Sequence, residues 1–82
     1  MLKIKNKVDL EKLARFGYKQ GGFFNEVWEK QVNSNTTIRI WYDRGIVLAQ
    51  KAGDTWSVHS VDYEIDEIKD LVKAGYVERV EE

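Results

Sequence analysis

The sequence contains no cysteine and no proline. Without cysteine, the chain has no disulfide bond, no thiolate metal ligand and no cysteine nucleophile, which is typical of a protein from a reducing compartment. Without proline or a Ser/Gly-rich linker, no internal boundary is visible, and residues 1–82 are expected to form a single domain. A chain of 82 residues can bury roughly 60% of its unfolded surface, which is enough for a modest core.

Long apolar runs are also missing. No segment approaches the roughly 18 apolar residues that a membrane span requires, and no apolar signal segment follows the first lysines. We therefore expect a cytoplasmic protein without a membrane partner. The net charge is −1, so a general attraction to nucleic acid is not expected. Residues 1–20 are mainly basic and residues 62–82 mainly acidic, which predicts a molecule with oppositely charged ends.

Residues that carry out chemistry are few. The single histidine, His59, and scattered acidic residues form no cluster with the spacing of metal ligands, so neither a metal nor another cofactor is expected. Gly21 and Gly22 lack the strand-to-helix context of a phosphate loop. Ser57, His59 and Asp62 have the residue types of a catalytic triad, but no oxyanion-hole motif accompanies them. The sequence therefore predicts a protein that is not an enzyme.

The middle of the chain predicts an antiparallel meander. Alternating apolar runs within residues 36–58 are joined by glycine-containing turns, and residues 23–32 precede them as an amphipathic strand. Helices are expected at residues 7–16 and 62–74, each ending at a Gly-Tyr pair whose glycine adopts the left-handed conformation. The predicted fold class is α+β, a two-layer sandwich. In it, an N-terminal and a C-terminal helix cover one face of a three- to four-stranded meander.

The loop at residues 43–45 decides which side chains share a face. A three-residue loop with Gly45 in the left-handed position pairs Tyr42 with Ile46. A loop of residues 44–45 alone would scatter the apolar side chains over both faces, so it is disfavoured. The core face predicted in this way consists of Phe24, Trp28, Val32, Ile38, Ile40, Tyr42, Ile46 and Leu48.

The preceding hairpin is predicted from its charges. A loop of residues 33–35 places Glu29 opposite Arg39, whereas a loop of residues 34–35 alone places Lys30 opposite Arg39. Like charges that face each other directly are destabilising, so the longer loop is favoured. The outer face of the sheet then carries Val27, Glu29, Gln31, Arg39, Trp41, Val47, Ala49 and Lys51.

Two arrangements are open for the strand that contains Trp56 and Val58. A loop of residues 52–54 turns both side chains to the core, and a loop of residues 53–54 turns them outward. The first is favoured, because burying both side chains is worth several kcal/mol at about 25 cal/mol per Å². Residues 76–80 either add a short strand or lie across the domain.

The outer face contains the candidate binding site. Its residues are Trp41, Val27, Val47, Arg39, Lys51 and Glu29. An aromatic anchor with a polar rim is typical of a protein-binding surface. The alternatives are that residues 76–80 or a second copy of the chain, as a homodimer, cover this face. A different function, the stacking of single-stranded nucleic acid on Trp41, is disfavoured by the net charge and by the absence of RNP motifs.

Four segments of the chain resemble a known group of proteins. They are LEKLARFGYK, VWEKQV, IRIWYDRG and IKDLVKAGYVERV, and together they resemble small uncharacterised proteins encoded by phages and prophages of Gram-positive bacteria. The resemblance covers most of the chain, and the group has no catalytic motif. It implies a small accessory factor, made in the host cytoplasm, that binds a protein such as a host protein.

Overall fold

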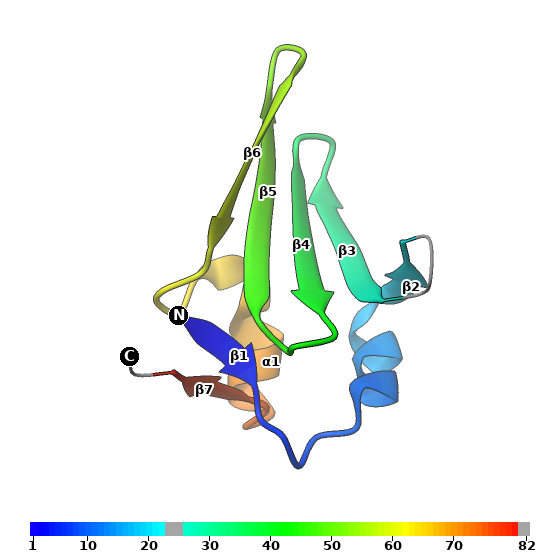
Figure 1. The fold of residues 1–82 in the computed structure, drawn as a ribbon, viewed down its shortest axis with the longest axis vertical. Coiled ribbons are helices and arrows are strands. Elements are labelled where there is room, and N and C mark those ends of the chain that lie inside the picture. Colours follow the sequence, from blue (N-terminus) through cyan, green and yellow to red (C-terminus); the bar gives the residue numbers. More distant parts are fainter. Residues whose placement is uncertain (23–25, 81–82) are drawn as a thin grey trace.

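The fold is built on a five-stranded antiparallel sheet, as the computed structural model shows (Figure 1). The structure describes residues 1–22 and 26–80. A second, two-stranded antiparallel sheet pairs the two ends of the chain. The predicted α+β class and antiparallel meander are confirmed, but the large sheet has five strands rather than the predicted three or four, because residues 19–21 add one. In spatial order, the strands of the large sheet are β2 (Lys19–Gly21), β3 (Val27–Asn33), β4 (Thr36–Trp41), β5 (Ile46–Ala52) and β6 (Thr55–Ser60), and the small sheet pairs β1 (Leu2–Ile4) with β7 (Val77–Arg79).

The helical segments are shorter than predicted. In the described part of the chain they are the 3₁₀ segments η1 (Leu10–Phe16) and η2 (Asp66–Ile68), followed directly by the helix α1 (Lys69–Lys73). The prediction of a helix from residue 62 is wrong, because Ile65 is still extended, with φ −109° and ψ 158°. Residues 62–65 instead carry the chain from the end of β6 to the layer behind the sheet (Figure 1).

Both predicted Gly-Tyr stops are confirmed, at residues 17–18 and 75–76. The two glycines have φ values of 90° and 76°. After each glycine, the tyrosine N–H donates a hydrogen bond to a carbonyl of the last helical turn, at Leu13 (3.2 Å) and at Leu71 (3.1 Å). These are the bonds of a Schellman motif, which requires the left-handed residue that glycine supplies at lowest cost.

The β3–β4 register is confirmed, although the turn differs from the prediction. Glu29 lies opposite Arg39. The loop contains only residues 34–35, and Asn33 already pairs across it, but a register shift just before Asn33 places Val32 in a β-bulge. The bulge supplies the one-residue offset that a longer loop would have supplied. Val32 borders a hollow beside η2 and α1, so it stays on the inner side of the sheet, but it lies outside the packed core and is 39% exposed.

The β4–β5 loop lies one residue earlier than predicted, at residues 42–44. Ile40 pairs with Ile46, so the predicted pairing of Tyr42 with Ile46 is wrong, and Tyr42 is 76% exposed. The left-handed residue is Arg44, with φ 72°, rather than Gly45. Because the pairing moves by two residues, side chains keep their faces. The predicted shared face of Ile38, Ile40, Ile46 and Leu48 is confirmed.

The β5–β6 turn contradicts the predicted position of Trp56 and Val58. The loop is residues 53–54, so Trp56 lies opposite Lys51 and Val58 lies opposite Ala49. Gly53 has φ 64°, as the first position of a type II′ turn requires. Trp56 is 48% exposed and Val58 is 56% exposed. Neither belongs to the core.

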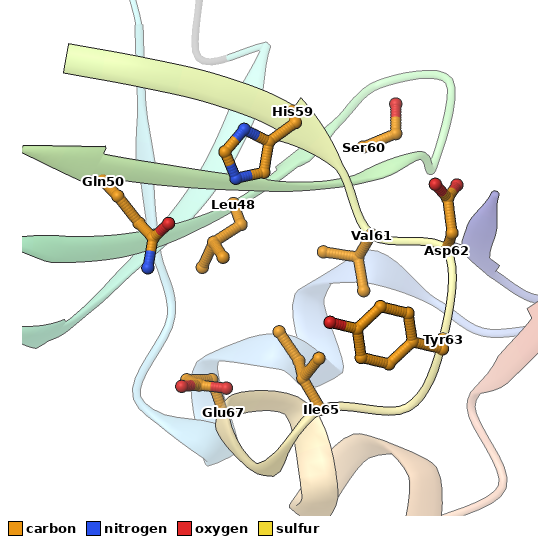
Figure 2. A pocket seen from close by; sticks show the side chains of 9 residues that line it. All are labelled: Leu48, Gln50, His59, Ser60, Val61, Asp62, Tyr63, Ile65 and Glu67. Carbon is orange, nitrogen blue, oxygen red and sulfur yellow. The ribbon is translucent and has the colours of Figure 1, made fainter.

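A hollow of about 320 Å³ lies on the other side of the β5–β6 hairpin (Figure 2). Leu48 and His59 border it from the hairpin, and Ile65 and Glu67 border it from the segment that leads to α1 (Figure 2). The hairpin thus extends past the helical layer. Burial of Trp56 was expected from its large apolar surface, but this part of the sheet has no packed layer to receive it.

The core lies between the inner face of β3–β5 and the helical segments. Leu48, predicted for this face, is partly buried and packs against the core, while Phe24 lies outside the described residues. None of the helices in the described part is long and apolar enough to cross a membrane. The largest fully buried side chains are Ile4, Leu13, Tyr18, Ile38, Ile40, Ile46, Ile68 and Leu71.

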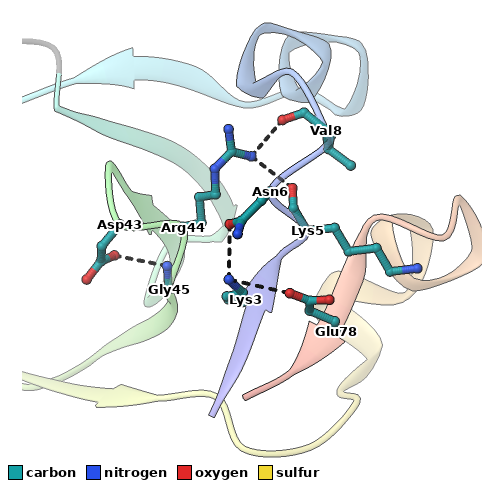
Figure 3. A network of polar contacts seen from close by, with 8 residues as sticks. All are labelled: Lys3, Lys5, Asn6, Val8, Asp43, Arg44, Gly45 and Glu78. Atoms are coloured by element: carbon teal, nitrogen blue, oxygen red, sulfur yellow. Dashed lines mark hydrogen bonds and ion pairs between the residues drawn. The ribbon is translucent and has the colours of Figure 1, made fainter. Parts of the chain in front are cut away.

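Arg44 joins the β4–β5 loop to the N-terminal segment (Figure 3). Its Nη1 donates hydrogen bonds to the carbonyl oxygens of Lys5 (2.9 Å) and Val8 (2.6 Å). Its own carbonyl accepts a hydrogen bond from the N–H of Ile4 (2.9 Å). These contacts explain why Arg44 occupies the left-handed position that glycine would occupy more easily. Gly45 is buried and forms a β-bridge with Lys3.

We expect Arg44→Ala to lower the free energy of unfolding by about 2 kcal/mol, because hydrogen bonds from a charged donor to partly buried carbonyls are lost. For a domain of this size, that corresponds to a decrease of roughly 10 °C in melting temperature. Thermal and urea denaturation measure the change. Arg15→Ala, at an exposed position, is the control. Equal stabilities of the two variants would contradict the role of Arg44.

Candidate binding face

The candidate site lies on the face of the large sheet that points away from the helical segments, here called the outer face. In Figure 1, α1 passes behind the sheet, on the opposite side. Cross-strand pairing places Val27 and Glu29 of β3, Thr37, Arg39 and Trp41 of β4, Val47, Ala49 and Lys51 of β5, and Trp56 and Val58 of β6 on the outer face. The β1–β7 pairing also answers an open question from the sequence, because residues 77–79 form a strand with the N-terminus.

A buried side chain lies next to Trp41 on the neighbouring strand. Val27 lies directly opposite Trp41 and is almost fully buried, so it adds no contact surface of its own. Trp41 and Val47 are partly exposed. Of the six predicted site residues, the structure brings five together here, while Lys51 lies farther along β5 near the tip of the hairpin.

Arg39 and Glu29 form the polar part of this face. Arg39 Nε lies 3.7 Å from Glu29 Oε2, and both side chains are about one-third exposed. Such an ion pair contributes little to stability because water screens it. Arg39 Nε is itself buried, and it has no hydrogen-bond partner within the described residues. Val47 lies opposite Arg39 on the next strand, so the charged pair borders the apolar part of the outer face.

Trp56 and Val58 extend the apolar surface beyond the residues that the sequence identified. The stripe they complete crosses three strands and consists of Trp41, Val47, Val58 and Trp56, with the small, buried Ala49 between them. Lys51 Nζ lies 6.0 Å from the centre of the Trp56 ring, within the range of a cation–π contact. The sequence signal for the outward orientation of Trp56 and Val58 was the possible two-residue turn with Gly53 in its first position.

The residues with the composition of a catalytic triad are not arranged as one. Ser57 and His59 lie on the same side of β6, opposite Gln50 and Leu48, and this side is the inner face rather than the outer face that the favoured turn implied. Asp62 also borders the hollow (Figure 2), and its Oδ1 lies 3.4 Å from the N-terminal nitrogen of Met1. Within residues 1–22 and 26–80, no group of three His, Asp or Glu side chains is placed to hold a metal ion.

No family model matches the sequence, and comparison with curated proteins and with solved structures gives no significant match either. The function must therefore be argued from the geometry of the outer face.

Proposed function

We propose that this protein is a non-enzymatic binding module that captures a partner protein on its outer face. The observation that carries the proposal is the apolar stripe of Trp41, Val47, Val58 and Trp56, whose two β6 side chains are about half exposed. Contiguous exposed apolar surface on a soluble protein is typical of an interaction site. Tryptophan and arginine are also the residues most enriched among those that dominate binding energy.

The rim of the stripe indicates the chemistry of the partner. Arg39 is already paired with Glu29, whereas Lys51 extends over the Trp56 ring at the other end. A complementary surface would place apolar groups on the stripe and a carboxylate near Lys51. The resemblance to phage and prophage proteins supports a role as an accessory factor in the host cytoplasm, with a host protein as the partner.

Affinity capture from a bacterial lysate, followed by titration of the captured protein, tests this proposal. We expect Trp56→Ala and Trp41→Ala each to weaken binding at least about tenfold, because truncation of a central aromatic residue costs more than about 1.4 kcal/mol. Tyr42→Ala, an exposed aromatic residue in the loop next to β4, is the control and should bind normally. Circular dichroism verifies that all variants are folded. Equal capture by all of them would refute a role for the stripe.

One observation favours a second candidate function. Lys51 next to the half-exposed Trp56 ring has the composition of a platform for stacking single-stranded bases. This function predicts quenching of tryptophan fluorescence by an oligonucleotide at low salt, with loss of quenching as salt increases. Lys51→Glu should reduce the quenching further. If the oligonucleotide causes no quenching at low salt, this second function is eliminated.

A further inference from the structure

The two edges of the large sheet differ in how they are protected. β2 at one edge has three residues and carries an exposed lysine, Lys19, both of which are common devices against unwanted strand pairing. β6 at the other edge has six residues, all exposed, with the sequence TWSVHS and neither lysine nor proline. In the part of the chain that the structure describes, no strand lies beyond β6.

The hydrogen bonds of β5 show which backbone groups of β6 are free. Val61 N–H donates to the Ile46 carbonyl at 3.0 Å, and on the other side of β5, Lys51 N–H donates to the Asn35 carbonyl at 2.8 Å. Backbone groups of successive residues point to alternate sides of an antiparallel strand. Residues 55, 57 and 59 therefore face β5, and the N–H and C=O groups of residues 56, 58 and 60 face outward.

We propose that β6 pairs antiparallel with β6 of a second copy of the chain, joining two five-stranded sheets into one. The second copy fits because β6 carries no acidic residue, lysine or arginine, so self-pairing opposes no like charges within the strand. The outward-facing groups of Trp56 and Val58 supply the ladder hydrogen bonds. This interaction uses the backbone edge of β6, and it shares the Trp56 and Val58 side chains with the stripe proposed for partner capture.

Charge and side-chain pairing select the register. A two-fold axis at Ser57 places Trp56 opposite Val58 of the second copy, twice, and aromatic with β-branched pairs are favourable across antiparallel strands. An axis at Val58 would instead place Asp54 opposite Asp62 of the second copy, which are like charges. With the axis at Ser57, the exposed apolar side chains of both copies meet on the same side of the joined sheet.

Sedimentation velocity across a concentration series tests the pairing. We expect the mass to increase from 9.6 kDa toward twice that value. Val58→Pro removes an N–H that is not bonded to β5, so it should raise the dimer dissociation constant at least tenfold while the hairpin persists. Val58→Ala keeps the N–H and is the matched control, expected to weaken the dimer less than proline does. A monomer at every concentration, or a dimer insensitive to proline, would overturn the proposal.

Cysteine variants test the register, and they do not depend on whether the proline variant folds. The chain has no cysteine of its own, so each variant reports a single position. Ser57→Cys should form a disulfide-linked dimer rapidly under mild oxidation, because residue 57 lies on the proposed axis. Thr55→Cys, on the same face of the same strand, should cross-link slowly. Equal cross-linking rates would overturn the register, and absence of a dimer in Ser57→Cys would overturn the pairing. Trp41→Ala should leave both results unchanged.

Discussion

Replacing Ile40 with alanine is expected to lower the free energy of unfolding by about 3 kcal/mol, within the range for isoleucine truncation in a core. Ile40 is fully buried in a central strand, opposite Trp28 on one side and Ile46 on the other. A domain of this size has a total stability of about 4 to 12 kcal/mol. The variant should therefore lose a large fraction of its stability, which urea denaturation at constant m-value would measure.

Val32→Ala is the informative control for Ile40→Ala. The sequence predicts both residues in the core, and both lie on strands of the same sheet. Val32 is 39% exposed and borders a hollow beside the helical segments, so its truncation should cost less than about 1 kcal/mol. Comparable losses for the two variants would mean that Val32 is packed in the core, as the sequence predicts.

The sequence predicts the meander well because alternation is a local signal. The loop at residues 43–45 was predicted one residue too late, which shifts the predicted pairing partners by two residues. A shift of two residues leaves every side chain on the same face of the sheet, so the residues of one face were still grouped correctly. The Glu29–Arg39 pair was predicted from charge alone and is confirmed. The bulge at Val32 could not be predicted from the sequence. A two-residue loop with a bulge and a three-residue loop without one give the same strand register.

Trp56 shows where the burial argument failed. Its large apolar surface favours the core only if a second layer covers that part of the sheet. The helical layer is shorter than predicted, since residues 62–65 are used to reach it. Four of the six predicted site residues, Trp41, Val47, Arg39 and Glu29, are partly exposed on the outer face, but half of its apolar stripe was missed because Trp56 and Val58 were assigned to the interior.

The β1–β7 sheet could not be derived from local patterns. Each strand has only three residues, and the two lie at opposite ends of the chain. A three-residue strand shows too few alternations to identify it. Its position depends on contacts between distant segments, including the hydrogen bond from Leu2 N–H to the Val61 carbonyl at 2.7 Å.

Tyr18 is a titratable side chain that lies in the hydrophobic core. It is 2% exposed, and its hydroxyl has no hydrogen-bond partner within the described residues. Lys30 Nζ lies 5.6 Å from the ring centre and 3.4 Å from Asp70 Oδ2. Burial raises the pKa of Tyr18 well above its usual value, and the negative charge of Asp70 adds to the increase. The folded protein therefore holds this phenol in its neutral form.

This raised pKa predicts a loss of stability at alkaline pH. Above about pH 10, the Tyr18 phenol ionises in the unfolded chain but not in the folded one, so the unfolded state is favoured by about 1.4 kcal/mol per pH unit. The stability that the neutral phenol contributes is fully present below pH 10 and decreases as pH rises toward the folded pKa. Between about pH 10 and about pH 12 the expected loss is roughly 2 kcal/mol.

Tyr18→Phe separates this effect from the titration of lysines, which both proteins share. At neutral pH, the variant should be more stable by about 1 to 2 kcal/mol, because a buried hydroxyl without a partner is removed. Above pH 10, the stability of the variant should fall less steeply than that of the wild type. The two slopes should differ by about 1.4 kcal/mol per pH unit, which corresponds to the one proton of the Tyr18 phenol. Tyr63→Phe, at an exposed position, is the matched control and should follow the wild type. Parallel pH profiles for Tyr18→Phe and the wild type would contradict the prediction. They would show that the phenol ionises as easily in the folded protein as in the unfolded chain.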